Sequence, residues 1–207
     1  MASLPKSPFV INGGCFCKAI TYTISVPAFE SRPLIPNPPK RPFGPQTDST
    51  KRLPLIALDH CNSCRRISGS IIECWFICPQ AWTQFSLLPR DSRHADSVVL
   101  ATDDETQRVT PATVEVLASA KKIEEKTYLK GFKSSESANR TFCGRCGTHF
   151  TFYYAGGDDD EAKDWGPYFD VAIGTFEKES LEMEGMRPGR QSWWDDGIKW
   201  VQEMIRA

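Results

Sequence analysis

The stretch GGCFCKAITYTISV, residues 13–26, joins a tight cysteine pair directly to a segment of alternating apolar and polar residues. Two glycines precede Cys15 and Cys17, and glycine lets the backbone turn sharply enough to bring two thiols of one turn together. From Ala19 to Val26 every second residue is apolar and most are β-branched or aromatic, which predicts a strand. The stretch therefore indicates a β domain that begins at a cysteine-rich turn.

Six of the eight cysteines fall into three pairs whose members are separated by one or two residues. The pairs are Cys15 with Cys17, Cys61 with Cys64, and Cys143 with Cys146. The first residues, MASLPKSPFV, lack the apolar run of a signal peptide. In a reducing compartment, closely spaced cysteines are more typical of metal sites than of disulfides. We therefore expect a cytoplasmic protein that binds zinc through these thiols.

The composition is that of an ordinary soluble domain of 207 residues, with 40% hydrophobic and 25% charged residues. A net charge of -1 gives no overall electrostatic attraction for nucleic acid. No apolar run approaches the length needed to cross a bilayer. We expect one domain over residues 1–207 whose partner is a small molecule, and neither a nucleic acid nor a membrane.

Short predicted strands separated by turns indicate a mainly β fold. Beyond residues 19–26, strands are predicted at Ser70–Cys78, Thr113–Ala118, Thr127–Phe132, His149–Tyr154 and Tyr168–Ile173. The even spacing of Cys74 and Cys78 puts both on one face of their strand, where core packing is expected. The acidic stretch from Asp158 to Asp164 lacks the spacing of a calcium loop and predicts a solvated loop.

Two segments lie outside this pattern. Eight of the fifteen prolines fall between Pro27 and Pro54, which predicts an extended loop that is neither strand nor helix. We expect the insertion as a whole to cover about residues 27–58. The extension at about 190–207 carries a helical apolar pattern in Asp195–Arg206, predicting a short amphipathic helix that docks on the body. The apolar residues of that pattern are Ile198, Val201, Met204 and Ile205.

Three cysteine pairs can make one closed site of four thiolates and leave one pair for a second, open site. Each cysteine of the pair at 143 and 146 is followed by glycine, as a tight structural turn requires. The pair at 61 and 64 is instead surrounded by polar side chains. These are Asp59, His60, Arg65, Arg66 and Ser68. The local chemistry therefore favours the pair at 61 and 64 as the open site.

Four stretches resemble, in order, the glutathione-dependent formaldehyde-activating enzyme family, which includes centromere protein V (the Gfa/CENP-V family). They are GGCFCKAITY, HCNSCRRISGS, RTFCGRCGTHF and DVAIGTF, and they extend from about Gly13 to Phe176. The resemblance implies an Mss4-like zinc-binding β-sandwich or β-tent with a short C-terminal helix. It implies a structural zinc held by Cys15, Cys17, Cys143 and Cys146. It also implies a second zinc on a Cys-x-Cys-x-x-Cys motif, where the family's enzyme joins formaldehyde to the thiol of glutathione.

Asp59 stands where that motif has its first cysteine. A carboxylate is an accepted zinc ligand, so Asp59 can join Cys61 and Cys64 around a catalytic zinc that activates a thiol or water. Alternatively, Asp59 acts as a general base beside the metal. The third alternative is structural: Asp59 orients His60 or caps a turn, and the second site is degenerate.

Arg65 and Arg66 suit the carboxylates of a peptide-like thiol such as glutathione or its adducts, because a guanidinium can donate two parallel hydrogen bonds to one carboxylate. The segment from Ser68 to Ser70 can supply donors to a developing oxyanion, or can simply turn the chain. We therefore expect a zinc-dependent enzyme of the carbon–sulfur lyase class with two zinc ions per chain. The alternative is a non-catalytic zinc module that binds a partner.

Overall fold

The computed structural model describes residues 3–35, 52–90, 108–154 and 167–206. Within these residues, ten strands form two sheets and the helices are short, so the prediction of a mainly β fold is confirmed. The smaller sheet is antiparallel and three-stranded, in the order β1, β2, β5. Its strands are β1 (Phe9–Gly14), β2 (Ile20–Val26) and β5 (Thr83–Leu87).

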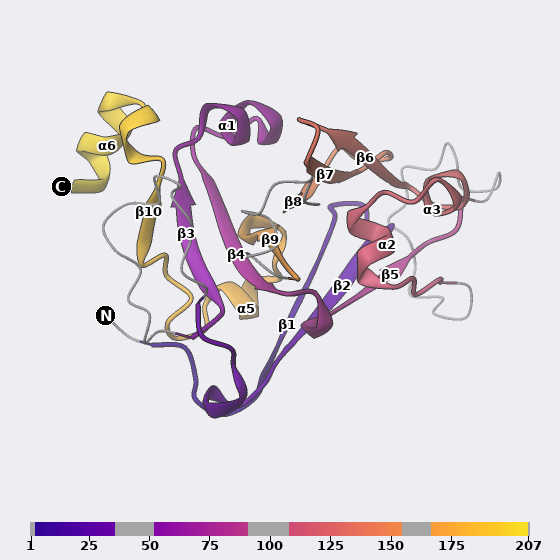
Figure 1. Ribbon diagram of the computed structural model, residues 1–207, viewed down its shortest axis with the longest axis horizontal. Coiled ribbons are helices and arrows are strands. Elements are labelled where there is room, and N and C mark those ends of the chain that lie inside the picture. The colour runs from indigo at the N-terminus through magenta and orange to yellow at the C-terminus, as the bar shows by residue number, and fades with distance from the viewer. Residues whose placement is uncertain (1–2, 36–51, 91–107, 155–166, 207) are drawn as a thin grey trace.

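The larger sheet has seven strands in the order β10, β3, β4, β9, β8, β7, β6 (Figure 1). Its strands are β3 (Leu55–Asp59), β4 (Glu73–Pro79), β6 (Leu129–Lys133), β7 (Ala138–Cys143), β8 (His149–Tyr154), β9 (Tyr168–Ala172) and β10 (Arg190–Ser192). All pairs are antiparallel except β10 with β3, which is parallel. Strands far apart in sequence, such as β4 and β9, are therefore neighbours in space.

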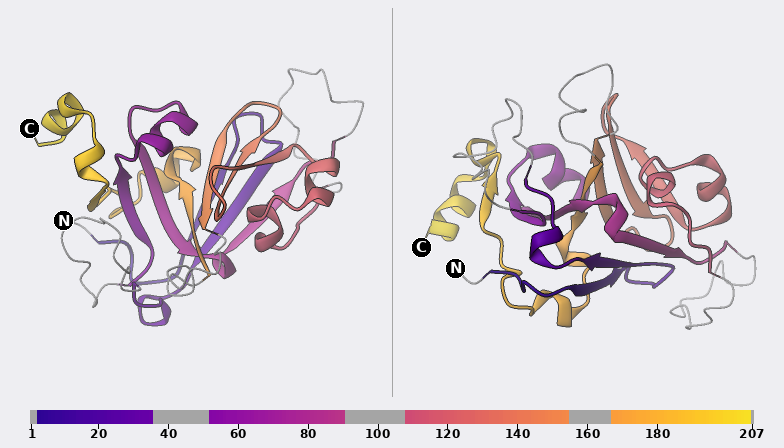
Figure 2. Two further views of the ribbon diagram at one scale, coloured as in Figure 1. Left: turned by 45° about the horizontal axis from the view of Figure 1, so that its top comes forward. Right: turned by 60° about the horizontal axis from the view of Figure 1, so that its bottom comes forward.

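The main hydrophobic core lies between the two sheets, and the smaller sheet lies against one side of the larger (Figure 2). Ile24 of β2 and Phe85 of β5 are fully buried in it, together with Phe76, Phe150 and Phe169 of the larger sheet. Cys78 also packs in this core and is fully buried, and Cys74 packs against it. The prediction that both cysteines share one strand face in the core is confirmed.

The opposite face of the larger sheet carries a second, smaller apolar cluster under helix α1 (Asn62–Ser68). Trp75 and Ile77 of β4 point to this face because successive side chains of a strand alternate. Cys64 of α1 packs on them. The two faces of the larger sheet thus serve different purposes, since one closes the core and the other lies beneath the pair of cysteines at 61 and 64.

Of the five strands predicted after residues 19–26, four are present, as β4, β6, β8 and β9. The strand predicted at Thr113–Ala118 is wrong, because residues Thr113–Leu117 form helix α2. The Glu115 side chain accepts a hydrogen bond from the Ala112 N–H at 3.3 Å, which stabilises the first turn of the helix. Val116 and Leu117 are fully buried, so packing overrides the strand preference of valine. Among the described residues, the other α-helices before the tail are α3 (Lys121–Lys126) and α5 (Lys178–Leu181).

The proline-rich segment is described at its two ends only. Residues 36–51 lie outside the described residues, as do residues 155–166 with the acidic stretch. A 3-10 turn, η1 (Phe29–Ser31), stands near the start, and the last residues of the expected insertion belong to β3, which begins at Leu55. The loop predicted between Pro27 and Pro54 therefore ends where β3 begins, and the 3-10 turn η1 is a helical element that this prediction did not include.

The C-terminal extension contains the predicted helix, α6 (Lys199–Arg206), after a 3-10 turn, η5 (Trp194–Asp196). Val201 is 2% exposed and anchors the helix, whereas Met204 is 64% exposed and does not. The extension also supplies the edge strand β10, which the sequence did not indicate. In the part of the chain that the structure describes, no helix is long and apolar enough to span a bilayer.

Candidate metal centres

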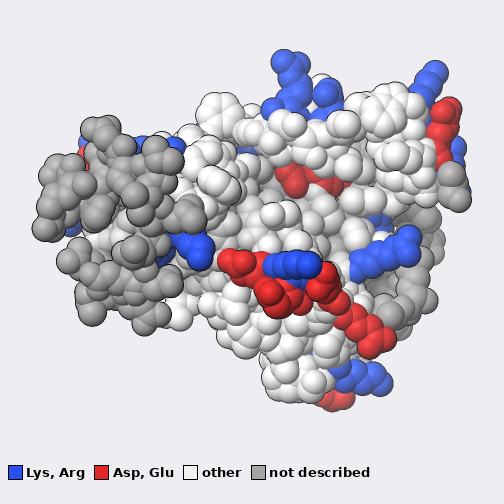
Figure 3. Space-filling model, turned by 180° about the vertical axis from the view of Figure 1, so that it is seen from behind, with Lys and Arg blue, Asp and Glu red and all other residues white. Residues whose placement is uncertain are grey.

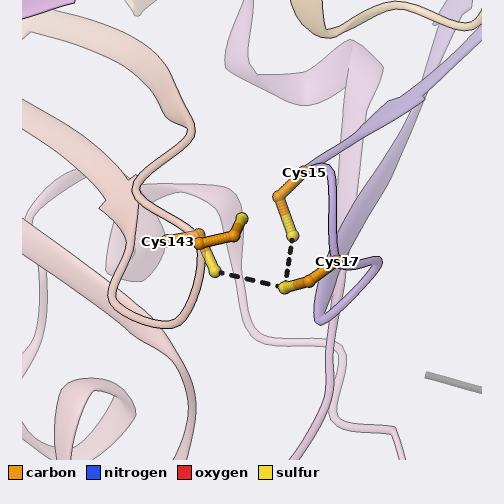
Figure 4. A group of neighbouring side chains, drawn as sticks. Cys15, Cys17 and Cys143 are labelled. Carbon is orange, nitrogen blue, oxygen red and sulfur yellow. Dashed lines mark hydrogen bonds between the residues drawn. The ribbon is translucent and has the colours of Figure 1, made fainter. Parts of the chain in front are cut away.

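The first cysteine group joins two turns that are far apart in sequence. Cys15 and Cys17 lie between β1 and β2, Cys143 ends β7, and Cys146 lies between β7 and β8. Figure 4 shows the thiols of Cys15 and Cys17 directed towards that of Cys143. All four sulfur atoms lie within 4.8 Å of one another, so this group can hold a metal ion.

The sulfur–sulfur distances allow a test of which ion the group fits. Sγ of Cys17 lies 3.5 Å from Sγ of Cys15 and 3.7 Å from Sγ of Cys143. Tetrahedral zinc with Zn–S bonds of about 2.3 Å gives sulfur–sulfur edges of about 3.8 Å. The four thiols therefore fit a closed tetrahedral zinc site.

Backbone N–H groups surround these sulfur atoms. The N–H of Ile20 donates to Sγ of Cys15 at 3.3 Å, and the N–H of Arg145 donates to Sγ of Cys143 at 3.4 Å. A hydrogen bond with the Cys15 thiol is the main factor that lowers the pKa of the Cys143 thiol to about 5. Burial is the largest factor that raises the pKa of the Cys17 thiol to about 11. Complete ionisation of the group therefore needs a cation that balances the crowded negative charge.

The second group consists of Asp59, Cys61 and Cys64. Asp59 ends β3, Cys61 precedes the first residue of α1, and Cys64 lies in its first turn. One donor atom from each lies within 4.8 Å of the others, so this group can also hold a metal ion. It offers three donors where the first offers four, and Cys61 is only half-buried.

Asp59 is 6% exposed and is held by two hydrogen bonds. Its Oδ1 accepts from the N–H of Cys61 at 2.8 Å, and its Oδ2 accepts from Nε1 of Trp75 at 2.9 Å. Each carboxylate oxygen has two lone pairs, so these bonds leave capacity for a metal ion. Asp59 thus caps the turn before α1, as the structural alternative expects, and also faces both thiols.

His60 is directed away from this group. Its Nε2 lies 2.7 Å from Oε1 of Gln191, and its ring packs edge-on against Trp194 at 4.9 Å between centroids. Asp59 therefore does not orient the His60 ring through either of these contacts. The His60 side chain helps to fix the C-terminal extension to the end of β3.

The two thiols of the second group differ in their readiness to ionise. A hydrogen bond with the Cys64 thiol is the largest factor that lowers the pKa of Cys61 to about 6. The same hydrogen bond, followed by burial, raises the pKa of Cys64. One proton therefore leaves the pair near neutral pH, and removing the second requires a nearby positive charge.

Arg140 of β7 supplies such a charge, and sequence reasoning missed it. Its Nη2 donates to Sγ of Cys64 at 3.3 Å, and its Nε donates to Oγ of Ser134 at 3.1 Å. The guanidinium lies 4.7 Å from the ring centroid of Phe152, and the residue is 3% exposed. The available signal was a charged residue three positions before a metal-type cysteine pair, inside a strand.

Two further missed residues are Glu73 of β4 and His149 of β8. Their side chains are 9% and 8% exposed, and Nδ1 of His149 lies 3.7 Å from Oε2 of Glu73. The His149 ring packs edge-on against Trp75, whose indole holds Asp59. The signal for Glu73 was a carboxylate within the otherwise apolar run IIECWFIC.

The residues predicted to bind a substrate beside the thiols form contacts within α1. Arg65 donates to Oδ1 of Asn62, and Arg66 is exposed. The Ser68 hydroxyl donates to the carbonyl of Cys64 at 2.9 Å, which is the ordinary behaviour of serine in a helix. The structure therefore brings together the predicted metal ligands, whereas Arg65 and Ser68 have local partners within α1 and Arg66 lies at the surface.

The surface charge around the described residues is mixed. Figure 3 shows one face on which basic side chains stand in small groups, separated by acidic and uncharged surface.

No protein-family model matches this chain, and no curated protein matches it.

Proposed function

We propose that this chain is a divergent member of the Gfa/CENP-V family and a zinc-dependent enzyme of the carbon–sulfur lyase class. In this proposal it has an Mss4-like fold, a structural zinc at the four-cysteine group, and a catalytic zinc at Asp59, Cys61 and Cys64. Its substrate is a small thiol of the glutathione type, or an adduct of such a thiol with a carbonyl compound. The eight free cysteines suit a reducing compartment, which supports a cytoplasmic location.

The proposal rests on the geometry of the second group. Three donors lie together, which is the ligand number of a catalytic zinc with one position open to substrate. A carboxylate and two thiols are all zinc ligands, so the donor set fits this ion. Asp59 and Cys64 are buried and Cys61 is half-buried, so Cys61 is the member of the group that is open to solvent.

The chain's own residues prepare this group for a thiol. Zinc, when bound, supplies a Lewis acid that lowers the pKa of a coordinated thiol or water. Arg140 stabilises the thiolate of Cys64 by donating to its sulfur. The N–H of Cys61 and the indole of Trp75 fix the Asp59 carboxylate, so the donors are oriented before substrate enters.

One observation favours the second candidate, a non-catalytic zinc module. Both oxygens of Asp59 already accept hydrogen bonds, so the turn before α1 is stable without a metal. The four-cysteine group alone joins the β1–β2 turn to the β7–β8 turn, which is sufficient for a structural zinc. A module of this kind needs no ion at the second group.

The deciding experiment counts zinc ions per chain in protein purified without a chelator. We expect two in the wild type and about one in Asp59→Asn, which keeps the shape of the side chain but is a poor zinc ligand. Asp59→Ala should give the same count with some loss of stability, since it leaves buried donors unpaired. Asp196→Ala, in the 3-10 turn η5, is the matched control and should keep both ions.

The outcomes separate the candidates. One zinc in wild type and variants alike overturns the enzyme proposal and leaves the module. Two zinc ions per chain in all of these proteins would show that Asp59 is not a zinc ligand, and would leave its role as a general base. With the expected counts, wild-type protein should accelerate loss of free thiol when glutathione and formaldehyde are mixed. Cys64→Ser should abolish that acceleration while its circular dichroism spectrum stays native.

A further inference from the structure

Glu73 and His149 meet where β9 leaves the larger sheet. Strand β9 separates β4 from β8 and ends at Ala172, which pairs with Trp75. Glu73 lies on β4, two residues before Trp75. His149 lies on β8, two residues before Thr151, and Thr151 pairs with Val171 of β9. Both residues are therefore beyond the end of β9, and their side chains approach each other across the space that the strand has left.

This pair faces the second metal group. Glu73 is directly opposite Asp59 in the antiparallel register of β3 and β4, so the two side chains share a face and are neighbours. Trp75 connects the two sets of residues, because its Nε1 donates to Asp59 and its ring lies 5.6 Å from that of His149. Glu73 thus adjoins Asp59, and His149 is separated from the ligands by the Trp75 side chain.

The environment of His149 is unusual for a structural histidine. Both ring nitrogens are buried, and neither makes a hydrogen bond to any residue that the structure describes. An unpaired buried polar group costs roughly 1–3 kcal/mol, so a structural histidine normally has a partner. Nδ1 has the Glu73 carboxylate at 3.7 Å, whereas Nε2 has no described partner at all.

Other titratable groups on this face set the charge balance. They are Asp59 on β3, Arg140 on β7, Tyr168 and Asp170 on β9, and Cys61 and Cys64 at α1. Arg140 is already bound to Cys64. His149 therefore has a carboxylate beside one ring nitrogen and no described hydrogen bond at the other.

We propose that His149 is the acid–base residue of the second group and that Glu73 is its positioning residue. Nε2 of His149 accepts the proton of a thiol that enters the group, while Glu73 holds the Nδ1 side of the ring. In this step the S–H bond breaks, its electron pair stays on sulfur, and an N–H bond forms at Nε2. The reverse transfer returns the proton when the thiol leaves. This inference rests on the proposed function, because it requires a thiol to bind at the second group.

The test is a count of the protons released when a thiol binds. Zinc-loaded protein in weak buffer at pH 7 with an indicator dye is titrated with 2-mercaptoethanol, and binding is followed separately by calorimetry. A free thiol with a pKa of about 8.5 is almost fully protonated at pH 7, so binding as a thiolate frees about one proton. Wild type should release much less than one proton per bound thiol, because His149 retains it. His149→Gln should release about one.

His60→Gln is the matched control, because His60 adjoins Cys61 but its ring contacts Gln191 and Trp194. It should release as few protons as wild type. Glu73→Gln should release an intermediate number, since the imidazolium loses its carboxylate neighbour. Equal release by wild type and His149→Gln, with thiol bound to both, overturns the role of His149 and leaves the proposed function intact. Absence of thiol binding to the wild type overturns both.

A second measurement does not depend on thiol binding. Nitrogen-15 spectra of the imidazoles in the zinc-loaded protein should show the His149 proton on Nδ1, beside Glu73, and Nε2 free. A ring protonated at both nitrogens from pH 6 to 8 would mean that His149 and Glu73 form a fixed ion pair. That result overturns the inference, because such a ring cannot accept the proton.

Discussion

The two cysteine groups contain pairs of similar spacing in opposite surroundings. The first is built from two turns that bring four thiols together, and backbone N–H groups donate to its sulfur atoms. The second combines two thiols with the Asp59 carboxylate, and the side chains of Arg140 and Trp75 donate to it. The environment, and not the spacing of the cysteines, distinguishes a closed group from an open one.

The difference is also one of charge. A doubly charged cation among four thiolates leaves a net charge of about -2, which backbone dipoles must stabilise. The same cation among two thiolates and a carboxylate leaves about -1, and the buried Arg140 brings the second group to about zero. A nearly neutral site with three donors can accept an anionic thiolate as its fourth ligand more readily than a closed dianionic one can.

The largest expected effect comes from breaking the first group. Cys143→Ser removes one of the four candidate ligands, and structural zinc sites contribute about 10–16 kcal/mol of binding free energy to folding. That figure matches or exceeds the total stability of an ordinary domain, about 5–15 kcal/mol. We expect Cys143→Ser to lose its cooperative thermal transition in circular dichroism, whereas Cys64→Ser keeps it.

Cys74→Ala is the control for this comparison, because Cys74 packs against the core and belongs to neither group. It should cost about 1 kcal/mol, the typical effect of a point substitution. A Cys143→Ser protein with a wild-type melting temperature would contradict the structural role of the first group.

The next effect concerns the buried cation of the second group. Arg140→Met leaves a buried negative charge without its partner, and losses of this kind cost about 3–5 kcal/mol. We expect the zinc-loaded variant to unfold at lower urea concentration by that amount. Arg145→Met, beside the first group and stacked on Tyr128, should cost less than about 1 kcal/mol. Equal losses for the two variants would remove the electrostatic distinction between the groups.

The sequence predicted the ligands of both groups better than their surroundings. Cysteine spacing is local, so the pairs were visible; alternation identified β2, and a mostly apolar run identified the strand that carries Cys74 and Cys78. The helix at Thr113–Leu117 was missed because burial of Val116 and Leu117 overrides strand propensity.

Glu73, Arg140 and His149 were missed for a different reason. Each is an ionisable residue within a strand, and its position near the second group depends on the strand order β3, β4, β9, β8, β7. The pairing of β4 with β9, in which Trp75 lies opposite Ala172, is a tertiary property that local patterns do not contain. The ligands of such a site can therefore be predicted from sequence, whereas the residues that tune it require the register of the sheet.

The smallest effect is a difference in reactivity among thiols that leaves the fold unchanged. When zinc is removed from the second group alone, Cys61 has a pKa of about 6, below its usual value of 9.0, because the Cys64 thiol is hydrogen-bonded to it. Since the thiolate is the reactive form, a lowered pKa gives more reactive Cys61 at a given pH. Its rate of modification by iodoacetamide should therefore rise from pH 5 and level off above about pH 7.

Cys64→Ala sharpens this test, because it removes the hydrogen bond that lowers the pKa. The midpoint of the Cys61 profile should then move from near pH 6 towards pH 9. Burial raises the pKa of Cys74 and Cys78 to about 12, so both should stay unmodified at pH 8 until the protein unfolds. Mass spectrometry of the modified peptides measures all of these rates. If the pH profile of Cys61 modification is the same in Cys64→Ala as in wild type, the two thiols ionise independently. The second group would then behave like an ordinary exposed pair of cysteines.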